Sequence, residues 1–405
     1  MVNGPRTEPG SSFRSTSARL TVIIVNYGSW PDVVRLVGEL EAEPELASGA
    51  LQVVVVDNAS QSPMPDSLAT LRPGLRVVSR AENGGFSVGV NEGWRLARTP
   101  WLLVLNPDVE IGRGTIRKVL ERIDRYELSP LGPPGIVGFG LRNPDGSFQG
   151  SVGVFPSLLR TVREQFIPRP RRKYQAGSRV RSGPVDWVTG ACMLVNAKMI
   201  AELGGMDEDF FLYYEEVAFS REAQARGWRV EHDSSLSVIH RHPLQNRPIS
   251  PKMRVITRHS KLLYFRKHLP RWQFLGLAGL VVAEAGFQGW VAKLSGRTVE
   301  ARAWFAVIEV VKRLLWRIDL RGLEVLRFAE QAASEASRIA EQAASEAPLA
   351  GSRPRSKGLE GKPEGAQGRR MDRPLGWLPE VGGEDSHQCN DGGVSSLEAD
   401  VGRGR

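Results

Sequence analysis

Cysteine is scarce in this chain, because only Cys192 and Cys389 occur among its 405 residues. Cys192 lies within an apolar run and Cys389 in a segment rich in glycine and charged residues, so we expect no disulfide between them. Residues 1–18 lack the apolar core of a secretory signal peptide and are interpreted as a disordered leader. The low cysteine content and the lack of a signal-peptide core favour a protein that faces the cytosol.

Long apolar runs and nucleic-acid-binding motifs are also missing. The apolar stretch over residues 274–283 ends at Glu284 and is too short to span a bilayer. No helix-turn-helix, zinc-finger or aromatic-basic sheet pattern accompanies the formal net charge of +9, so we expect no nucleic-acid partner. The charge points instead to phosphates or a membrane surface. Its densest segment, residues 160–181, is interpreted as a mobile cationic loop, with a merely solvated surface segment as the alternative.

The chain does contain several short apolar runs that end in polar residues. They span Leu20–Asn26, Leu51–Asp57 and Trp101–Leu105, with a shorter one at 76–79, and each is followed by a helical pattern. Strands that alternate with helices predict a doubly wound α/β domain with parallel strands. The polar residues at the carboxyl ends of these strands then share the edge where ligands bind in such sheets.

Three strand ends carry candidate binding residues. Asn26 and Asp57 are placed to accept from a nucleoside, although Asp57 could equally close a turn with its side chain. Asp108, in the sequence Asn106-Pro107-Asp108, is placed to hold a divalent cation and its diphosphate. The alternative is a turn aspartate that follows proline.

A glycine turn, Asn83-Gly84-Gly85, precedes a helix predicted over residues 87–98. Glycine lets the backbone approach a ligand closely, and the helix N-terminus offers N–H groups to a phosphate. Any tight turn would also use glycine, and Asn91 on this helix could be an ordinary surface position.

Two later stretches of the sequence contain further candidate site residues. The apolar strand predicted over residues 185–195 has Trp187, Thr189 and Gly190 at its mouth. Glu215 and Glu216 then begin a predicted helix, where the helix dipole stabilises acidic residues or one of them serves as a general base. Because adjacent helical residues point in different directions, at most one of this pair is expected to face a common site.

In this order, the motifs resemble the inverting family 2 glycosyltransferases, and particularly their bacterial rhamnosyltransferase-like branch. The resemblance covers roughly residues 20–268 and is carried by TVIIVNY, VVVVDNAS, ENGGFSVGVNEGW, LLVLNPDV, VDWVTGACMLV, GGMDEDFFLYYEEV and a later histidine. It implies an α/β fold of the GT-A type, a Rossmann-like, doubly wound mixed sheet, here with a C-terminal α-helical extension. It also implies transfer of a sugar from a nucleotide-diphosphate donor, usually with Mg²⁺ or Mn²⁺.

The resemblance also implies roles for single residues. The nucleotide and donor-sugar contacts would be Asn26, Asp57, Asn83, Gly84, Gly85, Asn91, Asn106, Trp187, Thr189 and Gly190. The metal would be bound by Asp108 and His240, and the catalytic base would be Glu215 or Glu216.

Two departures from the family pattern fall at the catalytic end of the site. Ala218 stands where the family usually has Asp, and residues 241–244 replace a run rich in glycine and serine. The alternative function is therefore a non-catalytic nucleotide-sugar-binding or assembly protein. A basic nucleic-acid binder is a second, lower-ranked alternative.

The predicted organisation is a GT-A domain over residues 19–250 and a basic amphipathic helical region over 251–328. An alanine-rich helical repeat over 329–347 and a disordered tail over 348–405 follow. Four tryptophans among basic residues suggest that the second region lies on an anionic membrane surface, with a soluble helical extension as the alternative. We expect a saccharide or polyprenyl-linked acceptor, dTDP-rhamnose as one candidate donor, and a cytoplasmic location peripheral to the inner face of the plasma membrane.

Overall fold

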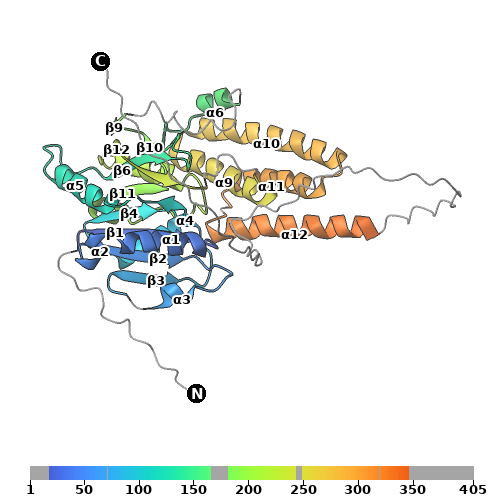
Figure 1. The fold of residues 1–405 in the computed structure, drawn as a ribbon. Coiled ribbons are helices and arrows are strands. Elements are labelled where there is room, and N and C mark those ends of the chain that lie inside the picture. Colours follow the sequence, from blue (N-terminus) through green and yellow to red (C-terminus); the bar gives the residue numbers. More distant parts are fainter. Residues whose placement is uncertain (1–17, 71, 166–180, 243–248, 319, 346–405) are drawn as a thin grey trace, which may run out of the picture.

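The computed structural model describes residues 18–70, 72–165, 181–242, 249–318 and 320–345. A mixed α/β domain lies beside a bundle of long helices (Figure 1). The tail predicted over 348–405 and nearly all of the predicted leader lie outside the described residues. The expected fold class, a GT-A-type mixed sheet with a C-terminal α-helical extension, is confirmed.

The main sheet has the strand order β3-β2-β1-β4-β11-β6-β12-β5, with β7 beside β6 and β9 beside β12. Its parallel half consists of β3 (Leu75–Ser79), β2 (Leu51–Asp57), β1 (Leu20–Asn26) and β4 (Trp101–Leu105). The other half consists of β11 (Cys192–Asn196), β6 (Ile136–Arg142), β12 (Val230–His240), β5 (Val109–Glu110), β7 (Phe148–Gln149) and β9 (Gly183–Pro184). Since β11 pairs antiparallel with β4, the carboxyl end of β4 meets the start of β11.

Every residue of β1 and β2 is buried, as their β-branched apolar runs predict for central strands. The helices of this domain are α1 (Trp30–Glu41), α2 (Pro44–Ala47), α3 (Asp66–Ala69), α4 (Phe86–Leu96), α5 (Thr115–Glu127), α6 (Leu158–Glu164), α7 (Ala197–Leu203) and α8 (Glu215–Ala225). Gly89 of α4 packs tightly on β1, since a Cβ there would lie 2.5 Å from the Val25 side chain. This close packing draws the start of α4 toward the strand ends.

Two segments differ from their predicted form. The predicted cationic loop begins as helix α6, because the Ser157 side chain caps it and Arg160 pairs with Glu164 at 2.9 Å. Residues 166–180 of that segment lie outside the described part of the chain. The single strand predicted over 185–195 is two strands, because β11 joins the main sheet while β10 (Trp187–Val188) pairs with β8 (Val152–Gly153).

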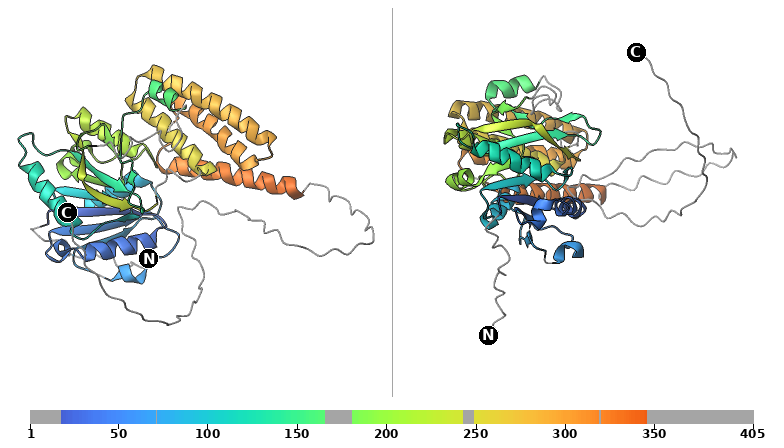
Figure 2. Two further views of the ribbon diagram at one scale, coloured as in Figure 1. Left: turned by 45° about the horizontal axis from the view of Figure 1, so that its top comes forward. Right: turned by 60° about the vertical axis from the view of Figure 1, so that its left-hand side comes forward.

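The C-terminal helices are α9 (Pro251–His268), α10 (Arg271–Leu294), α11 (Thr298–Leu315) and α12 (Leu323–Ser345). They lie side by side (Figures 1 and 2) and pack around a hydrophobic core that also includes Trp187 of β10, Phe210 and Phe211, and Val217 and Ala218 of α8. The apolar stretch expected to end at Glu284 is part of a longer helix, since α10 has 24 residues in all and Glu284 within it pairs with Arg258 of α9 at 2.6 Å. Among the described helices, α10 alone is long and apolar enough to cross a membrane by length and composition, with 33% of its apolar window buried.

Candidate active site

Asn26 and Asp57 end the first two strands side by side. The register of β1 and β2 pairs them directly, and the Asn26 amide nitrogen donates to the Asp57 carboxylate at 2.9 Å. The second Asp57 oxygen accepts from the Ser60 amide at 3.3 Å, so this carboxylate also closes the turn after its strand. Both residues are buried, with 0% and 5% of their surfaces exposed. The structure therefore brings the two predicted nucleoside contacts together as one preorganised polar pair.

Asn58, which no sequence pattern singles out, holds the glycine turn against these strand ends. Its side-chain nitrogen donates to the Asn83 side chain and to the Gly85 carbonyl, both at 2.9 Å. Its side-chain oxygen accepts from the Gly84 amide at 3.1 Å. The one sequence signal for this role is its place directly after a strand-ending aspartate.

Gly85 has a backbone conformation that only glycine adopts readily, with φ 89° and ψ 179°. A Cβ at this position would lie 2.1 Å from the Phe211 carbonyl oxygen, which also accepts from the Phe86 amide at 3.1 Å. The amides of Gly84, Gly85 and Phe86 are all bonded within the protein. The predicted offer of N–H groups to a phosphate therefore does not hold for these three residues.

Asn91 braces a loop rather than lining open space. Its side chain accepts from the Met206 amide at 2.8 Å and donates to the Met206 carbonyl and the Glu208 carboxylate, both at 2.8 Å. Only 1% of Asn91 is exposed. It connects α4 to the loop that leads into the acidic helix α8.

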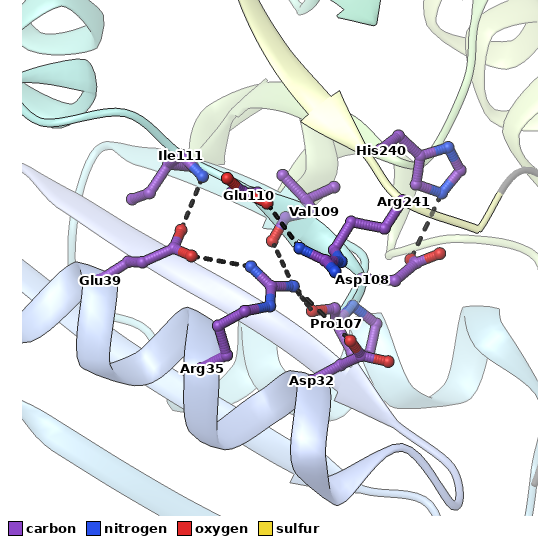
Figure 3. A network of polar contacts seen from close by, with 10 residues as sticks. All are labelled: Asp32, Arg35, Glu39, Pro107, Asp108, Val109, Glu110, Ile111, His240 and Arg241. Carbon is purple, nitrogen blue, oxygen red and sulfur yellow. Dashed lines mark hydrogen bonds and ion pairs between the residues drawn. The ribbon is translucent and has the colours of Figure 1, made fainter. Parts of the chain in front are cut away.

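Asp108 and His240 meet where β4 and β12 end. The His240 Nε2 atom lies 3.3 Å from an Asp108 carboxylate oxygen (Figure 3). Its Nδ1 atom lies 3.0 Å from the Gln149 side-chain oxygen. Burial alone would raise the pKa of Asp108, but the hydrogen bond and charge of His240 outweigh it and hold that pKa below its ordinary value. Two predicted site residues from distant parts of the chain are thus in contact.

Helix α1 clamps the segment around Asp108. Arg35 donates to the carbonyls of the two residues that flank Asp108, at 3.3 and 3.1 Å, and Glu39 accepts from the Ile111 amide at 2.7 Å (Figure 3). Arg35 and Glu39 also pair with each other at 2.8 Å. In the sequence both resemble ordinary charges on a helix surface, so only the structure reveals their contact with this segment.

The donor atoms at Asp108 and His240 are compatible with a divalent cation that a diphosphate helps to bind. Their 3.3 Å separation suits neighbouring ligands of one ion with bonds of about 2.1 Å. The Gln149 side-chain oxygen lies 3.0 Å from Nδ1, which leaves Nε2 as the His240 atom that faces Asp108 and would face a cation. Within the described residues, no cluster of three or more His, Cys, Asp or Glu side chains could hold a metal.

Trp187, Thr189 and Gly190, also predicted to contact the donor, make contacts within the protein. Trp187 is a packing residue with 1% exposure, and its indole N–H donates to the Val154 carbonyl at 3.1 Å. The Thr189 amide donates to the Ser151 carbonyl at 2.9 Å. A Cβ at Gly190 would lie 3.1 Å from the Phe86 ring.

Asn106 connects β4 to the turn at Gly190. Its backbone amide donates to the Ala191 carbonyl at 3.0 Å, and its side chain is half-buried. The turns that carry Asn106 and Gly190 are therefore adjacent, and Gly190 also lies beside Phe86 at the start of α4.

Glu215 and Glu216 begin α8 and are buried, with 6% and 5% exposure. They follow Tyr213 and Tyr214, which have left-handed φ values of 69° and 68°. Such conformations cost non-glycine residues about 1–3 kcal/mol each and are concentrated at functional sites. Helix α8 packs against β10, which carries Trp187.

Comparison with known proteins assigns the domain. Residues 21–204 match the family described as "Glycosyl transferase family 2". The chain contains a family 2 glycosyltransferase domain. The matched residues include the strand-end clusters up to Gly190, whereas Glu215, Glu216 and His240 lie beyond them.

Three curated proteins are similar in sequence to this chain. It is 28% identical over 267 residues to "N-acetylglucosaminyl-diphospho-decaprenol L-rhamnosyltransferase" of Mycobacterium tuberculosis, covering 61% of this chain and 83% of that protein. It is 29% identical to "Low-salt glycan biosynthesis hexosyltransferase Agl10" of Haloferax volcanii, covering 56% and 68%. It is 24% identical to "Rhamnosyltransferase WbbL" of Escherichia coli K12, covering 54% and 82%.

Solved structures resemble the family 2 glycosyltransferase more distantly. The mannosyltransferase PcManGT from Pyrobaculum calidifontis has 14% identity and a TM-score of 0.42, covering 74% of this chain and 87% of that one. S. aureus TarS 1–349 has 14% identity and a TM-score of 0.41, covering 81% and 91%.

Proposed function

We propose that this glycosyltransferase transfers a hexosyl group from a nucleotide-diphosphate sugar to a saccharide or polyprenyl-linked acceptor and inverts the anomeric centre. The first donor to test is dTDP-rhamnose, since two of the relatives are named rhamnosyltransferases. One observation carries the proposal. The pairs Asn26–Asp57 and Asp108–His240 lie at the same edge of one sheet, where a nucleotide and its diphosphate would lie end to end.

Each cluster has a separate role in this proposal. Asp57 binds the nucleoside, the fully buried Asn26 positions that carboxylate, and Asn58 keeps the glycine turn beside it. Asp108 and His240 would hold Mg²⁺ or Mn²⁺, which neutralises the charge that develops on the departing diphosphate. Glu215 or Glu216 accepts the proton of the acceptor hydroxyl.

The reaction needs no covalent enzyme intermediate. The acceptor oxygen forms a bond to the anomeric carbon on the face opposite the diphosphate, and the bond from that carbon to the diphosphate oxygen breaks. The hydroxyl proton passes to a glutamate carboxylate, and the nucleoside diphosphate leaves with the bonding electron pair. One displacement of this kind inverts the anomeric configuration.

The proposed location is cytoplasmic and peripheral to the inner face of the plasma membrane. Support comes from the relative whose name includes a decaprenol-linked substrate and from the apolar helix α10. A polyprenyl acceptor is itself held in the membrane. A transferase that docks on the membrane therefore encounters its acceptor by diffusion along the membrane surface.

A non-catalytic nucleotide-sugar-binding or assembly protein remains the second candidate. It is favoured by Ala218, which is buried on α8 at 1% exposure where the family usually has Asp. An aspartate at this position would add a carboxylate on the same helix as Glu215 and Glu216.

The test is to incubate the purified chain with a panel of dTDP-, UDP- and GDP-sugars and with Mg²⁺, Mn²⁺ or EDTA. Donor binding and nucleoside diphosphate release are measured together. We expect metal-dependent release from one donor when a lipid-linked acceptor is present, and loss of that release in Asp108→Asn. Binding without release favours the non-catalytic alternative, and no binding to any donor refutes both functions.

A further inference from the structure

The outer face of α10 is mainly apolar, and α6 packs on it only near its start, where a Cβ at Gly276 would lie 2.5 Å from the Leu158 side chain. Seven large apolar side chains on this helix are exposed: Trp272, Leu275, Leu280, Val282, Phe287, Trp290 and Leu294. Their spacing places them on one side of the helix. Between Arg271 and Lys293 the helix has a single charged residue, Glu284, which is paired with Arg258. We call this side of the helix the α10 face; an apolar surface of this extent marks a contact with another molecule or a membrane.

The opposite side of α10 is packed against protein. Its buried residues include Phe274, Leu277 and Val281 and, toward the C-terminal end, the small residues Ala285, Gly289 and Ala292; α10 packs mainly against α11 and α9. The views place α10 at the edge of the bundle (Figures 1 and 2). A bilayer that contacts α10 therefore meets one side of it, which favours a helix lying flat in the interface over one that crosses it.

A pocket of about 190 Å³ opens at the N-terminal end of this face. Three arginines line it, Arg266, Arg271 and Arg317, together with apolar side chains from α10, from α11 and from Leu269, which follows α9. Among the described residues that line it there is no carboxylate. Beside it lie two strongly exposed tryptophans, Trp272 at 64% and Trp316 at 77%.

We propose that this pocket binds the phosphate group of an anionic membrane lipid while the α10 face is buried among the lipid chains. Arginine guanidinium groups pair with phosphate oxygens through two parallel hydrogen bonds, and tryptophans favour the depth of the lipid headgroups. The apolar residues beside Arg271 and Arg317 continue directly into the α10 face, so one lipid molecule contacts both. The proposal rests on the proposed function only in that a membrane-borne acceptor brings the enzyme to a bilayer.

The test is co-sedimentation of the full chain with vesicles of neutral phosphatidylcholine, or of phosphatidylcholine mixed with phosphatidylglycerol. We expect tighter binding to the mixed vesicles. Arg271→Gln and Arg317→Gln should each weaken it about fivefold, as expected for one basic residue near an anionic surface. Arg125→Gln is the matched control, because Arg125 is exposed on α5 at a distance from the bundle.

A second set of variants tests the contact between the α10 face and the lipid chains. Phe287→Ser and Leu294→Ser remove side chains that are 64% and 67% exposed, and should weaken binding to both kinds of vesicle by about tenfold or more. Leu128→Ser removes an 84% exposed side chain outside the α10 face and should change nothing. Donor binding, measured in every variant, reports whether the fold is intact.

Three results would overturn the proposal. Equal binding to neutral and mixed vesicles would remove the phosphate role, and competition by inorganic phosphate at millimolar concentration would assign the pocket to a soluble anion. A concentration-dependent dimer that Phe287→Ser dissociates, without vesicle binding, would show that a second copy covers the α10 face. Turnover of a soluble acceptor is measured separately, so a vesicle result overturns only this proposal and a lack of turnover only the proposed function.

Discussion

The carbonyl oxygen of Phe211 lies 2.1 Å from the position that a Cβ of residue 85 would occupy, so these two residues make backbone contact that only Gly85 permits. Phe211 belongs to the loop that leads into Glu215, and Gly85 belongs to the turn that Asn58 holds against the strand ends. The contact therefore fixes the acidic helix relative to the proposed nucleoside pocket. Catalytic groups on separate elements need this kind of positioning.

Replacing Gly85 with Ala should destabilise the protein and weaken donor binding together. The added methyl group meets backbone rather than a flexible side chain, so we expect a loss of about 2–4 kcal/mol in the free energy of unfolding. Gly114→Ala is the control, because Gly114 also has positive φ, 72°, but a Cβ there would meet no atom within 4 Å. It should cost about 1–2 kcal/mol. Urea titration checks both, and equal losses would show that the Phe211 contact is unimportant.

The strand ends are the part of the site that sequence patterns predict best. The runs over Leu20–Asn26 and Leu51–Asp57 form strands with these same bounds, because central parallel strands bury both faces and leave a continuous apolar run. Parallel neighbours then place Asn26 beside Asp57 without further information. The glycine turn and the acidic start of α8 follow from local rules of the same kind.

Contacts between distant segments are the part that single-sequence patterns do not contain. No local sequence pattern shows that Phe211 contacts Gly85, or that Arg35 contacts the segment around Asp108. Trp187, expected at the mouth of the site, is a packing residue because Gly153 leaves room for its ring: a Cβ there would lie 2.0 Å away. Side-chain roles of this kind depend on cross-strand pairing, which periodicity does not encode.

Replacing Arg35 with Met should raise the metal concentration needed for half-maximal turnover about tenfold. Methionine keeps much of the side-chain volume but loses both hydrogen bonds to the carbonyls around Asp108, each worth about 1 kcal/mol. The assay is nucleoside diphosphate release against Mn²⁺ concentration. Arg117→Met, at a 76% exposed position on α5, is the control. An unchanged metal requirement in Arg35→Met would show that α1 does not support metal binding.

Replacing Asp233 with Asn should lower stability at neutral pH by about 1–2 kcal/mol, because Arg122 then loses its charged partner at 3.0 Å. Burial alone would raise the pKa of Asp233, but hydrogen bonds from Ser235 and the charge of Arg122 outweigh it and lower the pKa. Because the pKa is lower in the folded state, the charged Asp233 stabilises the protein fully at pH values above its pKa in the unfolded state, about 3.9. This stabilisation is lost as the pH falls through the pKa of the folded state.

Urea titrations of wild type and Asp233→Asn across pH check this sign. The difference between them should be constant from neutral pH down to about pH 4 and shrink below it. Asp145→Asn is the control: its pKa is also lowered, by Ser147, but the group is exposed and the substitution should leave stability unchanged. A difference that grows as the pH falls would contradict the assignment.

Replacing the catalytic base should abolish turnover while donor binding survives. Glu215→Gln and Glu216→Gln keep side-chain size and remove only the ability to accept a proton, so the variant at the base should lose about 10²–10⁴-fold in kcat. The other variant should lose much less, since neighbouring helical residues point in different directions. Glu222→Gln, on the same helix but 43% exposed, is the matched control and should keep full activity. If both glutamine variants turn over donor at the wild-type rate, the proton is accepted elsewhere and α8 supports the site only by packing.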